Sequence, residues 1–200
     1  RAQRDKQYHA ISVTDLVSKK IKLSYIEPDR CLMTLGLLGY TVVKPGDKVV
    51  YPHHGAAVVE KREKRKDPSG QTTEYLVLRM AHGDMTLAVP VANAEDVGMR
   101  WPISKEDVED LFEVLQKRDI REPANWSRRF KNHQEKLKSG DVYQVAEVVR
   151  NLALRDQAKG LSAGEKMLYT KALDVLVSEL AFALNTSEDK AMATVQDALS

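Results

Sequence analysis

Cysteine is nearly absent from this chain of 200 residues, and Cys31 is the single example. A lone cysteine excludes an internal disulfide and a zinc site built from cysteines. It fits a protein that stays in a reducing compartment, and we expect a cytoplasmic location.

The sequence also lacks an excess of charge of one sign. It has 31 Lys and Arg residues against 29 Asp and Glu residues, which gives a formal net charge of +2. Proteins that bind nucleic acid through their overall charge are far more basic. Any nucleic-acid binding by this chain must therefore depend on local basic patches.

Long hydrophobic runs are lacking as well. The longest apolar run, CLMTLGLLGYTVV at residues 31–43, is too short for a helix that spans a bilayer. An acidic EPDR precedes it and no small-residue cleavage site follows it cleanly, which is unlike a signal peptide. We expect a soluble protein that is not exported and does not bind a membrane.

The sequence contains no catalytic motif. GLSAGEK at residues 160–166 resembles a phosphate-binding loop only superficially, because its spacing is one residue short and no Ser or Thr follows the lysine. His53 and His54 are adjacent, so on a strand their side chains would point to opposite faces, and no third metal ligand is suitably spaced. We therefore expect a protein that is not an enzyme and has neither a metal nor a cofactor.

The chain divides into three parts by its patterning. Residues 1–42 have mixed charge and no sustained period, and we expect an N-terminal extension that is disordered or reflects a misplaced start. From residue 44 short β-rich runs alternate with turn signals, which predicts a small antiparallel sheet with an exposed edge strand. The predicted strands cover residues 48–51, 56–62, 73–80 and 85–90.

After about residue 100 the hydrophobic period becomes helical. Five segments each begin with a residue typical of a helix N-cap, namely Ser104, Asn125, Asp141, Ser162 and Thr186. Gly140 and Gly160 end two of them, and Gly98 and Pro102 mark a linker near residues 98–103. The fold class is thus α+β, with a barrel-like β domain at 43–100 and a compact five-helix domain at 101–200.

A first basic patch, EKREKRKDPSG at residues 60–70, runs into a turn of the predicted sheet. Such a charge run is typical of the solvated end of a hairpin. It is also compatible with a recognition edge for an acidic partner or for phosphates.

A second basic patch surrounds Trp126 in PANWSRRFKN. If a helix starts at Asn125, Trp126 lies in its first turn, where free backbone N–H groups attract anions. Arg128, Arg129 and Lys131 extend this cationic end. The spacing leaves two interpretations open: the ring packs under the preceding helix, or it is an exposed wedge beside phosphate-binding cations.

These motifs together resemble the CarD/CdnL family of bacterial transcription regulators, in its actinobacterial form. The resemblance runs from about residue 43 to near the C-terminus and rests on four motifs in the family's order. They are KPGDKVVYPHHGAAVVE, TEYLVLRMAHGDMTLAVPVANAEDVGMR, EPANWSRRFK and SGDVYQVAEVVRNLALRDQAKGLSAGEKMLYTKA.

The resemblance implies a Tudor-like N-terminal domain that binds the β subunit of RNA polymerase. The family's polymerase-binding arginine in the first hairpin matches Arg65. A second polymerase-binding arginine falls on the strand of Leu87 and Ala88, where this chain has Ala88 instead. This difference would weaken the contact with the polymerase.

The resemblance also implies a helical domain that binds promoter DNA and stabilises the open complex. The family's tryptophan wedge matches Trp126, at the upstream edge of the bubble, with Phe130 in the core. Its DNA-contacting lysines match Lys131 and Lys166, and the same motif assigns backbone contacts to Arg128 and Arg129.

We therefore expect a nucleoid-associated monomer whose partners are the polymerase β subunit and promoter DNA near the upstream fork. The alternatives are an architectural DNA-binding protein that acts without polymerase, and a protein–protein scaffold with no role on DNA.

Overall fold

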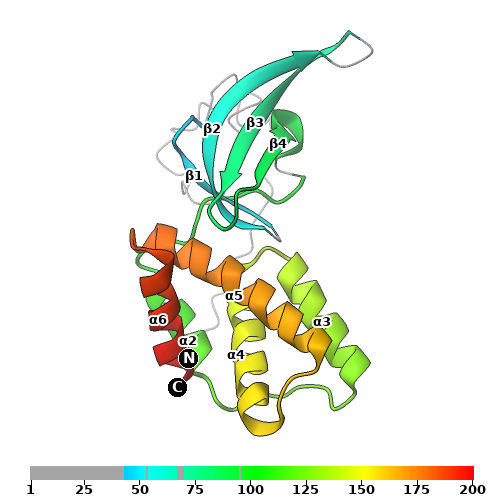
Figure 1. The fold of residues 1–200 in the computed structure, drawn as a ribbon, viewed down its shortest axis with the longest axis vertical. Coiled ribbons are helices and arrows are strands. Elements are labelled where there is room, and N and C mark those ends of the chain that lie inside the picture. Colours follow the sequence, from blue (N-terminus) through cyan, green and yellow to red (C-terminus); the bar gives the residue numbers. More distant parts are fainter. Residues whose placement is uncertain (1–42, 53, 67–69, 95) are drawn as a thin grey trace, which may run out of the picture.

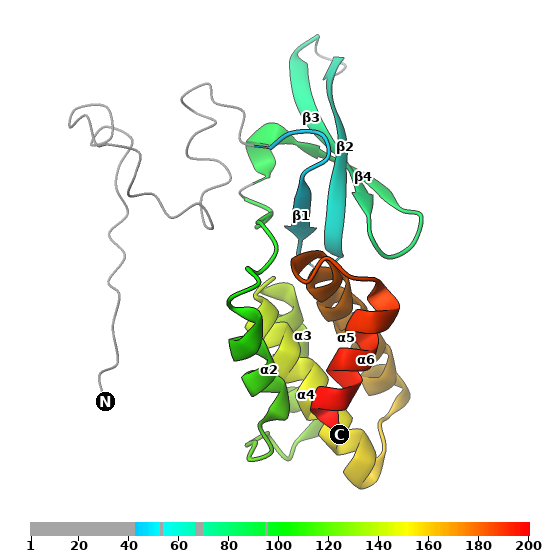
Figure 2. The same ribbon diagram turned by 90° about the vertical axis from the view of Figure 1, so that its left-hand side faces the viewer.

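The computed structural model describes residues 43–52, 54–66, 70–94 and 96–200 (Figure 1). The expectations for residues 1–42, including Cys31, and for His53 lie outside the described residues. Figures 1 and 2 show a curled sheet at one end of the described part of the molecule and a group of helices at the other, which confirms the predicted α+β class.

The sheet is antiparallel, and its strand order follows the chain. The predicted strands are confirmed, although the second extends four residues further toward the hairpin turn than its pattern predicts. The strands are β1 Lys48–Tyr51, β2 Gly55–Lys66, β3 Thr72–Met80 and β4 Thr86–Pro90, and a short 3₁₀ turn, η3 Val91–Asn93, follows.

One face of the sheet forms its own small core. Leu76 and Leu78 of β3 occupy alternate positions of the strand, and both are buried on the same face. They pack with Val49 of β1, Val59 of β2 and Val89 of β4. The apolar alternation therefore determines which side chains of the sheet remain outside.

The helices within the described residues 96–200 form a second core. Val145, Val149 and Leu152 of one helix and Leu176 and Leu180 of the next are buried, as their spacing predicts. The helices are α2 Val108–Gln116, α3 Trp126–Lys138, α4 Val142–Lys159, α5 Ala163–Ala183 and α6 Glu188–Leu199.

Most of the predicted helix caps are confirmed. The side chains of Asn125, Asp141 and Ser162 accept hydrogen bonds from backbone N–H groups at the starts of α3, α4 and α5. The prediction for α6 is wrong, because Ser187 is its N-cap. Thr186 instead closes the end of α5, where its N–H donates to Ala181 O at 3.0 Å.

The predicted start of α2 is also displaced. Ser104 and Asp107 bond each other as a capping pair would, with Asp107 N donating to Ser104 Oγ at 3.2 Å. These bonds close a turn, however, and the helix itself begins at Val108 with no side-chain cap.

The predicted linker is packed against both cores. Within it Arg100 pairs with Val50 of β1 through two backbone hydrogen bonds of 2.7 and 3.1 Å. The Arg100 guanidinium donates to both carboxylate oxygens of Glu179 on α5, at 2.6 and 2.8 Å. The Glu179 side chain is 1% exposed and that of Arg100 is 29% exposed, so this ion pair connects the sheet and the helices through a buried carboxylate.

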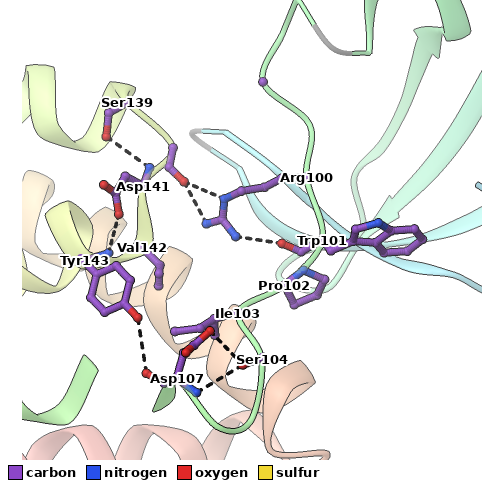
Figure 3. Close-up of a pocket in the computed structure, with 12 residues that line it drawn as sticks. Arg100, Trp101, Pro102, Ile103, Ser104, Asp107, Ser139, Asp141, Val142 and Tyr143 are labelled. Atoms are coloured by element: carbon purple, nitrogen blue, oxygen red, sulfur yellow. Dashed lines mark hydrogen bonds between the residues drawn. The ribbon is translucent and has the colours of Figure 1, made fainter. Parts of the chain in front are cut away.

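The same guanidinium also reaches the turn between α3 and α4. Its Nε and Nη2 donate to the carbonyl of Gly140 at 3.0 and 2.8 Å. A pocket of about 430 Å³ lies beside this junction, and Figure 3 shows Arg100 at its wall with Trp101, Asp107 and Tyr143. Arg100 therefore joins the sheet and the linker to α5 and to the turn between α3 and α4.

A second contact joins β2 to α5 and requires glycine. Ser178 of α5 accepts a hydrogen bond from Ala56 N at 3.1 Å and donates to Val175 O at 2.9 Å. Gly55 has φ +84°, and a Cβ there would lie 2.5 Å from Ser178 Oγ. Only glycine permits this close approach without displacing α5.

We expect Arg100→Met to lower the free energy of unfolding by about 3 kcal/mol, because it leaves the buried Glu179 carboxylate without its cation. Arg79→Met is the matched control, since Arg79 pairs with Glu60 on the surface at 3.3 Å and such pairs contribute about 1 kcal/mol or less. Urea denaturation measures the free energy of unfolding of both variants. Equal losses in the two variants would contradict the structural importance of the junction.

Candidate nucleic-acid and polymerase interfaces

Trp126 is the first residue of α3 and is held in place on the surface. Its indole is 46% exposed, and Nε1 donates to Ser162 Oγ, the N-cap of α5, at 3.3 Å. One face of the ring stacks on Phe130, with ring centroids 5.1 Å apart and planes at 13°. The ring is therefore neither a buried core residue nor a freely moving surface side chain.

The two aromatic rings, whose spacing left both a buried and an exposed position open, lie in different environments. Phe130 is half-buried and packs against the helical core, while Trp126 lies outside it. Gly164 of α5 faces both rings, because a Cβ at this position would lie 3.5 Å from Phe130 Cε2 and 3.9 Å from Trp126 Cζ2. A small residue at this point lets the rings lie against α5.

The N-termini of α3 and α5 meet at Trp126, which gives this surface a positive character. The first N–H groups of a helix have no intrahelical partner and favour anions. The first turn of α3 contains no acidic residue. Arg128, Lys131 and Lys166 are exposed here, and Met167, next in the chain, is 76% exposed.

Arg129 differs from its cationic neighbours because its guanidinium is buried. Its side chain is 4% exposed and pairs with Glu165 of α5 at 3.0 Å. It also donates to the carbonyls of Pro123 and Ala124 at 3.0 and 3.3 Å. The expectation of a backbone-phosphate contact from Arg129 is therefore corrected: this residue joins α3 to α5.

Glu165 is the centre of this buried network. Its carboxylate accepts from Ser162 Oγ at 2.8 Å and from Ser162 N at 3.1 Å, which completes the predicted capping box. Burial by itself raises the pKa of this carboxyl, but the bonds from Ser162 and Arg129 and the nearby charge of Arg155 outweigh it and lower the pKa to about 2. Glu165 is therefore charged wherever the protein functions.

A second buried network anchors the middle of α3 to the segment before it. His133 Nε2 lies 2.6 Å from Glu122 Oε1, and Asn151 Nδ2 donates to the same oxygen at 2.8 Å. Burial works to raise the pKa of Glu122, but the bonds from His133 and Asn151 lower it on balance. The start and the middle of α3 are therefore both held by hydrogen bonds inside the protein.

The candidate polymerase contacts lie on the sheet, and strand pairing places them on its faces. Arg65 is opposite Thr73, and Ala88 is opposite Val77. Thr73 and Val77 are four residues apart on β3, so Arg65 and Ala88 share the outer face about 13 Å apart along the strand direction. Leu87 lies on the other face, where it packs against the core of the sheet.

Arg65 is held on that outer face by its neighbours. Its Nε donates to Glu63 Oε1 at 2.6 Å, and its guanidinium lies 5.1 Å from the ring centroid of Tyr75. Of the other basic residues, Lys64 and Lys66 are exposed, whereas Arg62 is half-buried and bonds Glu74 at 2.8 Å. In the first basic patch, Arg62 thus has a structural role, whereas Lys64 and Lys66 are exposed to a partner.

The expected edge strand is β4. It is the last strand of the sheet, and among the described residues it pairs with β3 alone. Such an edge presents backbone N–H and C=O groups that another chain can pair with.

Two further findings concern the described part of the chain as a whole. None of its helices is long and apolar enough to cross a bilayer. No group of three or more His, Cys, Asp or Glu side chains in the described ranges is placed to hold a metal ion.

Sequence reasoning did not find the long-range partners of the site. Ser162 and Glu165 were recognisable as a capping box, but nothing local indicated that the cap also contacts an indole and an arginine 36 residues away. Gly164 gave the one usable signal, because a glycine in the first turn of a helix is unfavourable unless something packs against it.

Comparisons with known proteins match both parts of the chain. The model of the CarD-like/TRCF RID domain matches residues 43–101, and that of the CarD C-terminal domain matches residues 110–196. A curated relative from Bacillus subtilis (strain 168), named "Putative transcription factor YdeB", is 31% identical over 135 residues. This alignment covers 68% of the present chain and 88% of the relative.

The depressed pKa of Glu165 predicts a pH dependence of stability. The ion pair contributes fully above the ordinary pKa of 4.5, and its contribution is lost as the pH falls toward 2. Glu165→Gln should therefore destabilise the protein by about 3 kcal/mol at neutral pH and flatten the loss of stability between pH 4.5 and 2.

Urea denaturation across this pH range measures the effect, with Glu109→Gln as the control for removing one exposed carboxylate of α2. Curves for wild type and Glu165→Gln that stay parallel throughout would disprove the role given to the Glu165 ion pair.

Proposed function

The chain belongs to the CarD/CdnL family of bacterial transcription regulators, and we propose that it stabilises the open promoter complex by binding RNA polymerase and promoter DNA together. The observation that carries the proposal is Trp126, a large apolar ring held on the surface beside cations and two helix N-termini.

On the DNA side, Trp126 acts as a wedge at the upstream fork of the bubble. Minor-groove proteins insert apolar side chains at base steps while basic neighbours hold the backbone, and an exposed ring can equally stack on an unpaired base. Arg128, Lys131 and Lys166 are exposed cations suited to the flanking phosphates. Arg129 has no such role in the proposal, because it is buried.

On the polymerase side, the outer face and free edge of the sheet bind the β subunit. Arg65 is exposed and oriented by Glu63 and Tyr75, which favours contact with an acidic or polar partner. Ala88 shares this face but offers no charge. Leu87 contributes through the backbone of the edge strand, since its side chain packs inward.

The two weak contacts reinforce each other. A protein shifts an equilibrium toward the open state only if it binds that state more tightly than the closed one, and a wedge for separated or distorted bases meets this condition. Binding to polymerase raises the effective concentration of the wedge at the promoter. High affinity for free DNA is then unnecessary, which agrees with a net charge of only +2.

We expect Trp126→Ala to shorten the lifetime of open complexes on a purified promoter by roughly tenfold, as expected for the loss of one base-stacking ring. The lifetime is measured by challenge with a competitor at saturating protein. The lifetime with Trp126→Phe should fall between those with the wild type and with Trp126→Ala. An unchanged lifetime would rule out the wedge.

The same proteins test the alternative that the chain is an architectural DNA-binding protein that acts without polymerase. Tight binding of the full chain to free duplex, with a steep dependence on salt and no requirement for polymerase, would favour that alternative over the proposal.

On the polymerase side, we expect Arg65→Glu to weaken binding of the full chain to the β subunit by about tenfold, and Ala88→Arg to strengthen it. Surface plasmon resonance measures both, with Lys117→Glu at the end of α2 as the control for charge reversal away from the sheet. If Arg65→Glu and Lys117→Glu have equal effects, the proposed face is incorrect.

A further inference from the structure

The hydroxyl of Ser162 makes two contacts more than a helix cap requires. As the cap of α5 it accepts from Glu165 N at 3.4 Å, and it also donates to Glu165 Oε2 at 2.8 Å. Its remaining lone pair accepts the indole N–H of Trp126 at 3.3 Å. A hydroxyl has one hydrogen to donate and two lone pairs, so Ser162 is fully used and connects two helices.

This bond fixes the edge of the indole that faces the protein. Nε1 bonds Ser162, the neighbouring Cζ2 lies against the backbone at Gly164, and one face of the ring lies on Phe130. The 46% of Trp126 that is exposed therefore lies on the opposite edge and the opposite face of the ring. The ring therefore presents a defined edge to solvent.

The position of Ser162 is itself fixed relative to α3. Glu165, which holds the Ser162 hydroxyl and N–H, is bonded by Arg129 at 3.0 Å, and Arg129 follows Trp126 by three residues on α3. The contacts form a closed circuit from Trp126 through Ser162, Glu165 and Arg129 back to the start of α3. Because Arg129 and Glu165 are buried, their ion pair is shielded from water and salt, whereas the Trp126–Ser162 bond lies at the surface.

We propose that Ser162 is a positioning residue for the wedge, and that the buried Arg129–Glu165 pair aligns it. The inference rests on the proposed function, in which Trp126 contacts DNA at the fork. A free indole samples several side-chain conformations, and ordering it on binding reduces affinity. Ser162 removes most of that cost by holding the ring in one orientation before DNA arrives.

A double-mutant cycle in open-complex lifetime tests the proposal. We expect Ser162→Ala to shorten the lifetime by about fivefold in the wild-type background, the effect of losing one hydrogen bond. In the Trp126→Ala background it should have no further effect, because Ser162 acts through the ring. Equal shortening in both backgrounds would overturn the proposal and leave Ser162 as a cap only.

Two further variants separate positioning from helix stability. Ser162→Thr retains the hydroxyl and should restore the wild-type lifetime. Ser187→Ala removes the equivalent cap of α6, where Lys190 N donates to the Ser187 side chain. Ser187→Ala should lower the unfolding midpoint as Ser162→Ala does but leave the open-complex lifetime unchanged. If the lifetime instead falls in proportion to the midpoint in both variants, Ser162 has no positioning role.

The indole itself supplies a readout that is independent of transcription. In a Trp101→Phe background the remaining fluorescence comes from Trp126, and Ser162→Ala should increase the rapid component of its anisotropy decay. Unchanged anisotropy would overturn the inference. If Ser162→Ala frees the ring but Trp126→Ala does not affect the open complex, positioning is upheld and the proposed function fails.

Discussion

The ion pair between Arg100 and the buried carboxylate of Glu179 is the interaction on which the arrangement of the molecule depends. It joins the last residues of the sheet segment to α5 with two hydrogen bonds, and the same arginine holds the turn before α4. A charged pair removed from water is stable only with its full set of partners. The sheet and the helices are therefore fixed to each other through defined atoms.

Helix α5 extends this constraint to the candidate DNA surface. Its C-terminal half carries Ser178 and Glu179, which contact the sheet side, and its N-terminus carries Ser162 and Glu165, which hold Trp126. Seventeen residues of helix separate Ser162 from Glu179, a span of about 25 Å. Figure 1 shows α5 running from the sheet to the start of α3. The helix thus sets the distance between the polymerase-binding face and the wedge in the proposed function.

Charged residues serve two different purposes within one short motif. Arg128 and Arg129 are adjacent, yet the first is exposed and the second is buried against Glu165. The helical period explains the difference, since position 129 shares the inward face with Phe130 and His133. A count of basic residues in the motif therefore overstates the cations available to DNA.

Local features of the fold could be predicted because their causes are local. Short β-rich runs between turn signals defined the strands, and Asn125, Asp141 and Ser162 marked helix starts through bonds to residues two or three positions on. Even so, the sequence pattern did not distinguish Thr186 from Ser187, because both hydroxyls can cap a helix and the end of α5 decides between them.

Long-range pairs could not be predicted in the same way. Arg100 and Glu179 are 79 residues apart, and Arg129 and Glu165 are 36 apart, so no spacing rule connects them. The inward position of Leu87 also depended on strand register, which a short alternating pattern leaves open by one residue. The cationic neighbours of Trp126 left its exposure open, and only the family resemblance indicated a wedge, whereas its orientation depended on these distant contacts.

Site-specific photo-crosslinking from position 126 would show whether the ring lies at the upstream fork of the bubble. A photoreactive phenylalanine analogue replaces Trp126 in the full chain, and the crosslinked nucleotides are mapped in complexes with polymerase and promoter DNA. The account predicts crosslinks confined to the upstream fork of the bubble and dependent on polymerase. Crosslinks absent from DNA, or spread along the duplex without polymerase, would contradict it.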